Sequence, residues 1–197
     1  MTIEEVMGAA KTLRAEKLLC LIMLSFCVFS CASPSPSPYA RQEFMLGEEA
    51  LNQGRYGEAI DHFTAYLAKV PKDADAHLKL GRALLHNEQL DEAIPHFKDA
   101  ISLKPEDEQS KLLIKNSIFN EAAKFFEQKK YDVAIRYLIS YLTINADDID
   151  THIRLTRYFL GMGDRRNAIG SVKRAASLDP KNPEVIELLD YFSRGFH

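Results

Sequence analysis

Cysteine is scarce in this 197-residue sequence, and the few copies lie near one end. Cys20, Cys27 and Cys31 are the only three, so no cysteine follows residue 31. This excludes a disulfide or a cysteine-based metal site within residues 32–197. Catalytic motifs are absent as well: there is no glycine-rich phosphate loop, no HExxH and no GxSxG. We therefore expect no enzyme activity, no cofactor and no small-molecule substrate.

A strong charge of either sign is also lacking. The chain has 25 basic and 28 acidic residues, for a formal net charge of −3. Residues 1–30 carry three of each sign, so the balance stays at −3 without them. Nucleic-acid binding relies on a basic surface that attracts phosphates. We therefore expect no nucleic-acid partner.

The sequence has no apolar run long enough to span a bilayer. The longest, Leu18–Phe29, has 12 residues and would rise about 18 Å as a helix, against a hydrocarbon layer of about 30 Å. A helix cannot extend it past the prolines that begin at Pro34. A core helix would have a polar face, which this run lacks. Basic residues precede the run, as in a secretory signal peptide, and translation could start at Met1 or Met7.

The end of the apolar run resembles the lipobox of bacterial lipoproteins. Val28, Phe29 and Ser30 precede Cys31, which that resemblance makes the lipidated residue after removal of residues 1–30. Ala32, instead of Asp, then implies transfer to the outer membrane, with the chain facing the periplasm. The alternative is an ordinary signal peptide cut after Ala32, giving a secreted or periplasmic protein. Residues 31–39 would form the lipidated cysteine and a Ser-Pro tether, an extended spacer of roughly 19 Å over Ser33–Pro38.

The rest of the chain repeats with a period of 34 residues. Residues 46–73 align with residues 80–107, which places small residues and phenylalanines at matching positions. The pattern resembles the tetratricopeptide repeat (TPR) family, whose period is 34. Further copies give four repeats, at residues 40–73, 74–107, 115–148 and 149–182. The resemblance implies an all-α TPR solenoid of about four helix-turn-helix repeats, closed by a capping helix and tail at residues 183–197.

The third repeat is offset by 41 residues, so seven extra residues lie within 107–114. Seven residues are close to two helical turns and keep the helix in phase. We predict that the first helix of the third repeat begins two turns early, with the acidic residues 106–108 at its positive end. A flexible loop is the alternative.

The histidines follow the same repeat. His77 and His152 share one position, where partial burial beside the core is expected. His62 and His96 are 34 residues apart, which predicts a separation of about 10 Å on neighbouring outer helices. A shared metal requires nitrogens near 2.1 Å from the ion, so we interpret both as surface histidines and expect no metal site.

The family resemblance also implies a concave groove lined by the first helix of each repeat. It mixes cationic, apolar and polar side chains suited to a partner segment with acidic and apolar groups. The candidate groove residues are Lys79, Arg82, His86, Phe119, Asn120, Phe126, Arg154 and Arg157. The hypothesis is a cell-envelope lipoprotein that binds a protein or peptide as a scaffold in pilus, secretion or outer-membrane assembly. The alternative is an adaptor or regulator of a periplasmic cell-wall or glycan enzyme.

Overall fold

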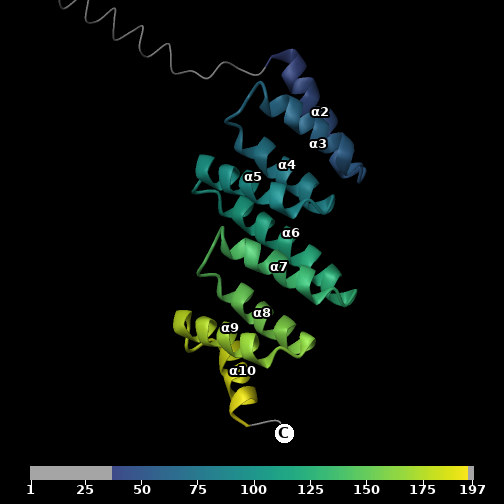
Figure 1. The fold of residues 1–197 in the computed structure, drawn as a ribbon. Coiled ribbons are helices and arrows are strands. Elements are labelled where there is room, and N and C mark those ends of the chain that lie inside the picture. Colours follow the sequence, from purple (N-terminus) through teal and green to yellow (C-terminus); the bar gives the residue numbers. More distant parts are fainter. Residues whose placement is uncertain (1–36, 195–197) are drawn as a thin grey trace, which may run out of the picture. The chain divides into compact units, whose positions relative to one another are not determined.

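The computed structural model describes residues 37–194, and all regular structure in that part of the chain is helical (Figure 1). Consecutive helices pair as α2 (Pro38–Asn52) with α3 (Tyr56–Leu67), α4 (Ala74–His86) with α5 (Leu90–Leu103), α6 (Glu108–Glu127) with α7 (Tyr131–Leu142), and α8 (Ile149–Met162) with α9 (Arg165–Leu178). The last helix is α10 (Pro183–Ser193). This confirms the predicted all-α solenoid with a final extra helix. The predicted leader, Cys31 and most of the tether lie outside the described residues.

The turn inside each pair uses one backbone position in the left-handed region. Gly54 and Gly163 have φ of 71° and 85° there. The equivalent residues of the second and third pairs are Glu88 and Lys129, with φ of 63° and 61°. A non-glycine residue in this region costs about 1–2 kcal/mol. The tight helix-turn-helix packing therefore determines the turn conformation, and glycine only makes it less costly.

Small residues lie where the two helices of a pair cross, and in the first two pairs they face an aromatic ring. A Cβ added to Gly47 would lie 2.9 Å from the ring of Phe63, and one added to Gly81 would lie 2.6 Å from the ring of Phe97. Both rings are fully buried. The four alanines at the next repeating position are also fully buried: Ala59, Ala93, Ala134 and Ala168. Small side chains at the crossings thus let paired backbones approach closely, as the repeat pattern predicts.

The first helix of the third pair begins early. α6 runs for 20 residues from Glu108, and its N-cap Asp107 accepts a hydrogen bond from the Ser110 backbone N–H at 3.0 Å. This confirms the predicted two-turn extension and excludes the loop alternative. The extension adds Leu112 ahead of the regular repeat, and Lys115, the first residue of that repeat, pairs with Asp148 and Asp150 at the start of α8.

The last helix covers the apolar end of the fourth pair. Val185 of α10 is fully buried in a cluster with Ile153, Val172 and Ala175. Asn182 caps α10 by accepting hydrogen bonds from the Glu184 and Val185 N–H groups. Within residues 37–194, no helix combines the length and apolar character needed to cross a bilayer.

Candidate functional site

A cleft of about 230 Å³ opens between α6, α8 and the first turn of α10. We call it the α6–α8 cleft. Its lining residues come from these three helices: Leu112, Lys115, Asn116, Phe119, Asp150, Ile153, Arg154, Arg157 and Glu184. Residues 112, 115, 116 and 119 share one face of α6, because side chains three and four positions apart on a helix are neighbours. The same spacing unites residues 150, 153, 154 and 157 of α8.

Phe119 forms the aromatic floor of the cleft. Its side chain is buried, and its ring meets Tyr141 edge-on at 5.8 Å between centroids. The Arg154 guanidinium lies 4.5 Å above the ring, and Lys115 Nζ lies 5.5 Å from the ring centroid. Such cation–π contacts orient cations over an aromatic face. The floor therefore presents an apolar ring edged by positive charge.

Two of the cleft cations already have carboxylate partners. Lys115 Nζ lies 2.7 Å from Asp148 Oδ1 and 2.5 Å from Asp150 Oδ2. Burial lowers the pKa of Lys115, but the hydrogen bonds to the two aspartates outweigh burial and leave the pKa raised. Arg157 pairs with Glu184 of α10 at 2.6 Å. These contacts tie α6 and α10 to α8.

Arg154 differs from its neighbours. It is exposed and has no carboxylate within 4 Å among residues 37–194, although its side chain also hydrogen-bonds Tyr158. Its planar guanidinium can donate two parallel hydrogen bonds to a carboxylate. Arg154 is thus the cleft residue best suited to an incoming acidic group.

The predicted groove residues of α4 are engaged in packing between helices. Lys79 pairs with Glu48 of α2 at 3.0 Å. The Nε of Arg82 is buried without a hydrogen-bond partner in the described part of the chain. His86 Nδ1 lies 2.8 Å from Glu121 Oε1 of α6, and its ring stacks on Tyr56 at 5.0 Å. None of these three residues lines the α6–α8 cleft.

The two predicted aromatic groove residues do not share one floor. The ring of Phe126 stacks on Tyr158 at 4.1 Å, and a Cβ on Gly161 would lie 2.7 Å from it. Phe126 therefore packs at the C-terminal end of α6, seven residues beyond Phe119, and does not line the cleft. Asn120 is exposed, one position beyond Phe119. The structure brings together only Phe119, Arg154 and Arg157 of the predicted set.

Comparison with known families agrees with the helix pairs. Residues 44–108 match the sequence model of a family described as tetratricopeptide repeat. The matched region spans most of the first two helix pairs and is similar to tetratricopeptide repeats. No curated protein sequence matches the chain.

Solved structures similar to the chain include MamA and YrrB. MamA is 18% identical over 79% of this chain and 88% of its own, with a TM-score of 0.41. MamA 41-end from Desulfovibrio magneticus RS-1 is 16% identical over 81% and 94%, with a TM-score of 0.41. YrrB, described as a TPR protein with an unusual peptide-binding site, is 18% identical over 77% and 74%, with a TM-score of 0.41. These likenesses are too distant to carry an argument about function.

The TPR pattern missed three residues that shape the cleft. Leu112 lies on the early turns of α6, which precede the third repeat, and Lys115 is the first residue of that repeat. Glu184 lies on the capping helix, outside any repeat. The sequence could have indicated Lys115. Once α6 is extended, Lys115 lies one turn before Phe119 on the same face of the helix.

Proposed function

We propose that this TPR chain is a protein-interaction scaffold that binds a partner segment in the α6–α8 cleft. The observation that carries the proposal is the exposed Arg154 guanidinium held 4.5 Å above the buried Phe119 ring. An arginine so placed combines a bidentate donor with a neighbouring apolar surface. Both are typical of residues that dominate binding energy at interfaces.

The partner segment must match both parts of the cleft. One carboxylate would approach Arg154, and apolar side chains would pack on the exposed Leu112 of the same cleft. Asp150 and Glu184 add negative charge at the rim, so a strongly acidic segment would be repelled there. We therefore favour a segment with one or two acidic residues beside aliphatic ones.

The proposed place of action is the cell envelope. The lipobox-like sequence ending at Cys31 supports a lipid anchor in the outer membrane with the TPR unit facing the periplasm. The Ser-Pro tether would keep that unit close to the membrane surface. In this setting the scaffold would serve an assembly of envelope proteins, such as a pilus, secretion or outer-membrane assembly machine.

A charge reversal in the cleft tests the binding site. The protein would be purified from solubilised native membranes, and the captured partner would be identified by mass spectrometry. Titration of the purified partner segment would then compare the parent with Arg154→Glu. We expect the reversal to weaken binding at least about tenfold, or about 1.4 kcal/mol, with an unchanged melting temperature.

The matched control reverses charge on the outer helices. Lys98 and Lys173 are both exposed, on α5 and α9. The double variant Lys98→Glu with Lys173→Glu should bind the partner segment as the parent does. Loss of binding in this control, with binding retained by Arg154→Glu, would place the partner on the outer face and refute the proposal.

A further inference from the structure

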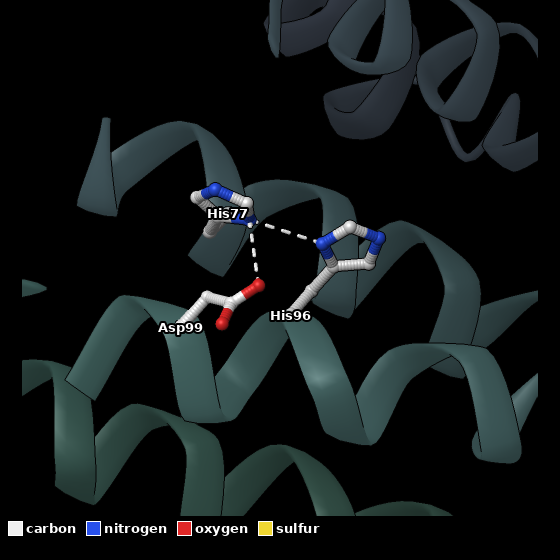
Figure 2. A group of neighbouring side chains, drawn as sticks. All are labelled: His77, His96 and Asp99. Carbon is white, nitrogen blue, oxygen red and sulfur yellow. Dashed lines mark hydrogen bonds and ion pairs between the residues drawn. The ribbon is translucent and has the colours of Figure 1, made fainter. Parts of the chain in front are cut away.

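Three metal-ligating side chains converge in the second repeat, away from the α6–α8 cleft (Figure 2). His77 comes from α4, and His96 and Asp99 come from α5. The Nδ1 atoms of the two histidines are 3.0 Å apart, and Asp99 Oδ2 is 3.8 Å from His77 Nδ1. The sequence pattern placed His96 on the surface, whereas it is partly buried against His77. The reason is that His77 lies 19 residues earlier on the paired helix, and the 34-residue period does not by itself show which positions of paired helices meet.

The backbone fixes the orientation of His77. Its Nε2 lies 3.0 Å from the Pro71 carbonyl oxygen, which can only accept a hydrogen bond. Nε2 therefore carries the proton of the neutral ring, and Nδ1 offers its lone pair toward His96. Metal-binding histidines are commonly held this way, with the second ring nitrogen donating to a backbone carbonyl.

A hydrogen bond between the two imidazoles is compatible with this tautomer of His77. With the Nδ1 lone pair of His77 free, the His96 Nδ1–H donates across the 3.0 Å separation. Burial lowers the pKa of His96, and the His77 ring lowers it further, against the opposite pull of Asp99 and Glu92.

The other repeats lack this donor set at the same positions. In the first repeat the three positions hold Glu43, His62 and Ala65, and only a contact of 2.7 Å between His62 Nδ1 and Glu43 Oε2 remains. In the third they hold Ile118, Tyr137 and Ser140, and in the fourth His152, Ser171 and Arg174. The fourth repeat keeps one contact of this group: His152 Nε2 lies 3.2 Å from the Ala146 carbonyl oxygen, as His77 Nε2 lies near that of Pro71. This contact is therefore a feature of the repeat fold and is not particular to the three-residue cluster. The convergence of three donors is particular to the second repeat among residues 37–194.

We propose that His77, His96 and Asp99 bind a zinc-type divalent cation, which takes the place of the hydrogen bond between the two Nδ1 atoms. Two nitrogens bound tetrahedrally to zinc at about 2.0–2.1 Å lie about 3.3 Å apart, so the Nδ1 atoms need to separate by only a few tenths of an ångström. His96 retains one proton by moving it from Nδ1 to Nε2. The metal would join α4 to α5 beside the loop that carries Pro71.

The carboxylate completes the site without strain elsewhere. The Asp99 side chain is 58% exposed, so it can turn toward the ion freely. A set of two imidazoles and one carboxylate suits zinc, cobalt, nickel or copper, whereas calcium and magnesium prefer oxygen ligands alone. Three protein ligands would leave the fourth tetrahedral position for a water molecule.

The test is a titration of the full chain, prepared without a histidine tag in detergent and stripped of metal by a chelator. Zinc binding would be followed by calorimetry, and cobalt binding by the visible absorption of a tetrahedral ion. We expect one zinc per chain. His96→Ala should weaken zinc binding at least about tenfold, and Asp99→Asn should weaken it by a similar or smaller factor. Excess zinc should raise the melting temperature of the parent and leave that of His96→Ala unchanged.

His62→Ala is the matched control, because it removes the histidine at the same position of the first repeat. This variant should bind zinc as the parent does. The proposal is overturned if the parent binds zinc no more tightly than His96→Ala does, or if His62→Ala weakens binding equally. If His96→Ala loses helicity by circular dichroism, the exposed Asp99→Asn decides instead, and parent-like zinc affinity in that variant counts against the site.

Discussion

Single atoms decide how closely the paired helices approach. Gly81 of α4 lies against the fully buried ring of Phe97 in α5, and the equivalent contact joins Gly47 to Phe63 in the first pair. Gly170 of α9, by contrast, has open space where a Cβ would stand. The same residue type therefore has opposite consequences at two helical positions. At one it makes room for a ring, and at the other it only weakens the helix.

We expect Gly81→Ala to destabilise the protein. The new Cβ would stand 2.6 Å from Phe97 Cε1, and overpacking a core costs about 1–3 kcal/mol, more than the helix gains by losing a glycine. The control Gly170→Ala should instead stabilise it by about 0.5–1 kcal/mol. Thermal and urea unfolding measure both. Equal stabilisation by the two alanines would show that the Gly81 crossing is not close-packed.

At the scale of helices, the long α6 determines where the cleft forms. Its two extra turns begin at Asp107, whose Oδ1 accepts from the Ser110 N–H and whose Oδ2 accepts from the Ser110 hydroxyl at 2.6 Å. The hydrogen bonds from the Ser110 hydroxyl and backbone lower the pKa of Asp107. Those turns carry Leu112, which lines the cleft, and they continue into Lys115, which pairs with Asp148 and Asp150 at the start of α8. A shorter helix would leave that side of the cleft open.

Asp107→Ala should fray the start of α6, because the first backbone N–H groups lose their acceptor. Amide hydrogen exchange at Ser110 should accelerate while exchange within α9 stays the same. Since the folded pKa of Asp107 is lowered, its contribution is complete above an unfolded pKa of about 3.9 and is lost as pH falls through the folded value. The stability difference between parent and variant should therefore vanish in strong acid.

Asp107→Asn is the control for this prediction. Its side-chain oxygen can still accept from Ser110, so the helix start should remain protected at neutral pH. It cannot titrate, so the acid-dependent part of the stability difference should be missing. Unchanged exchange at Ser110 in Asp107→Ala would contradict the assigned role of the cap.

At the scale of the whole molecule, neighbouring helix pairs bury their apolar side chains in a main cluster and a smaller one. The main cluster runs from Ala40 in α2 to Tyr158 in α8, and a smaller one at the C-terminal end includes Val172 and Val185. Each repeat buries its apolar face only against the next, as in other solenoids. α10 ends the series by covering the fourth pair. The N-terminal sequence would then determine where this unit is held in the cell.

Cys31→Ser should release the protein from membranes, because the lipid anchor proposed for Cys31 could no longer be attached. Each buried methylene of such an anchor contributes about 0.8 kcal/mol to membrane binding. Fractionation after a high-salt wash, with metabolic labelling by palmitate, measures the change. Cys27→Ser, within the proposed leader, should leave the protein in the membrane pellet. A Cys31→Ser protein that still pellets would exclude lipidation as the means of attachment.

The sequence alone determined the helix pairs and their order. The 34-residue spacings of Gly47 and Gly81 and of Phe63 and Phe97 report a contact that the first two repeats share. Such contacts are visible in one dimension because each copy must satisfy the same packing geometry. The early start of α6 could be predicted for the same reason, since seven residues preserve the helical phase.

Only the tertiary structure decided which side chains meet across helices. The 34-residue period indicates which face of a helix is apolar, but it does not specify the partner of a polar side chain on an adjoining helix. Thus Arg154 lies over Phe119, Phe126 stacks on Tyr158, and His77 meets His96. Each contact depends on the rotation and separation of two packed helices, which are fixed by the combined packing of the core around them.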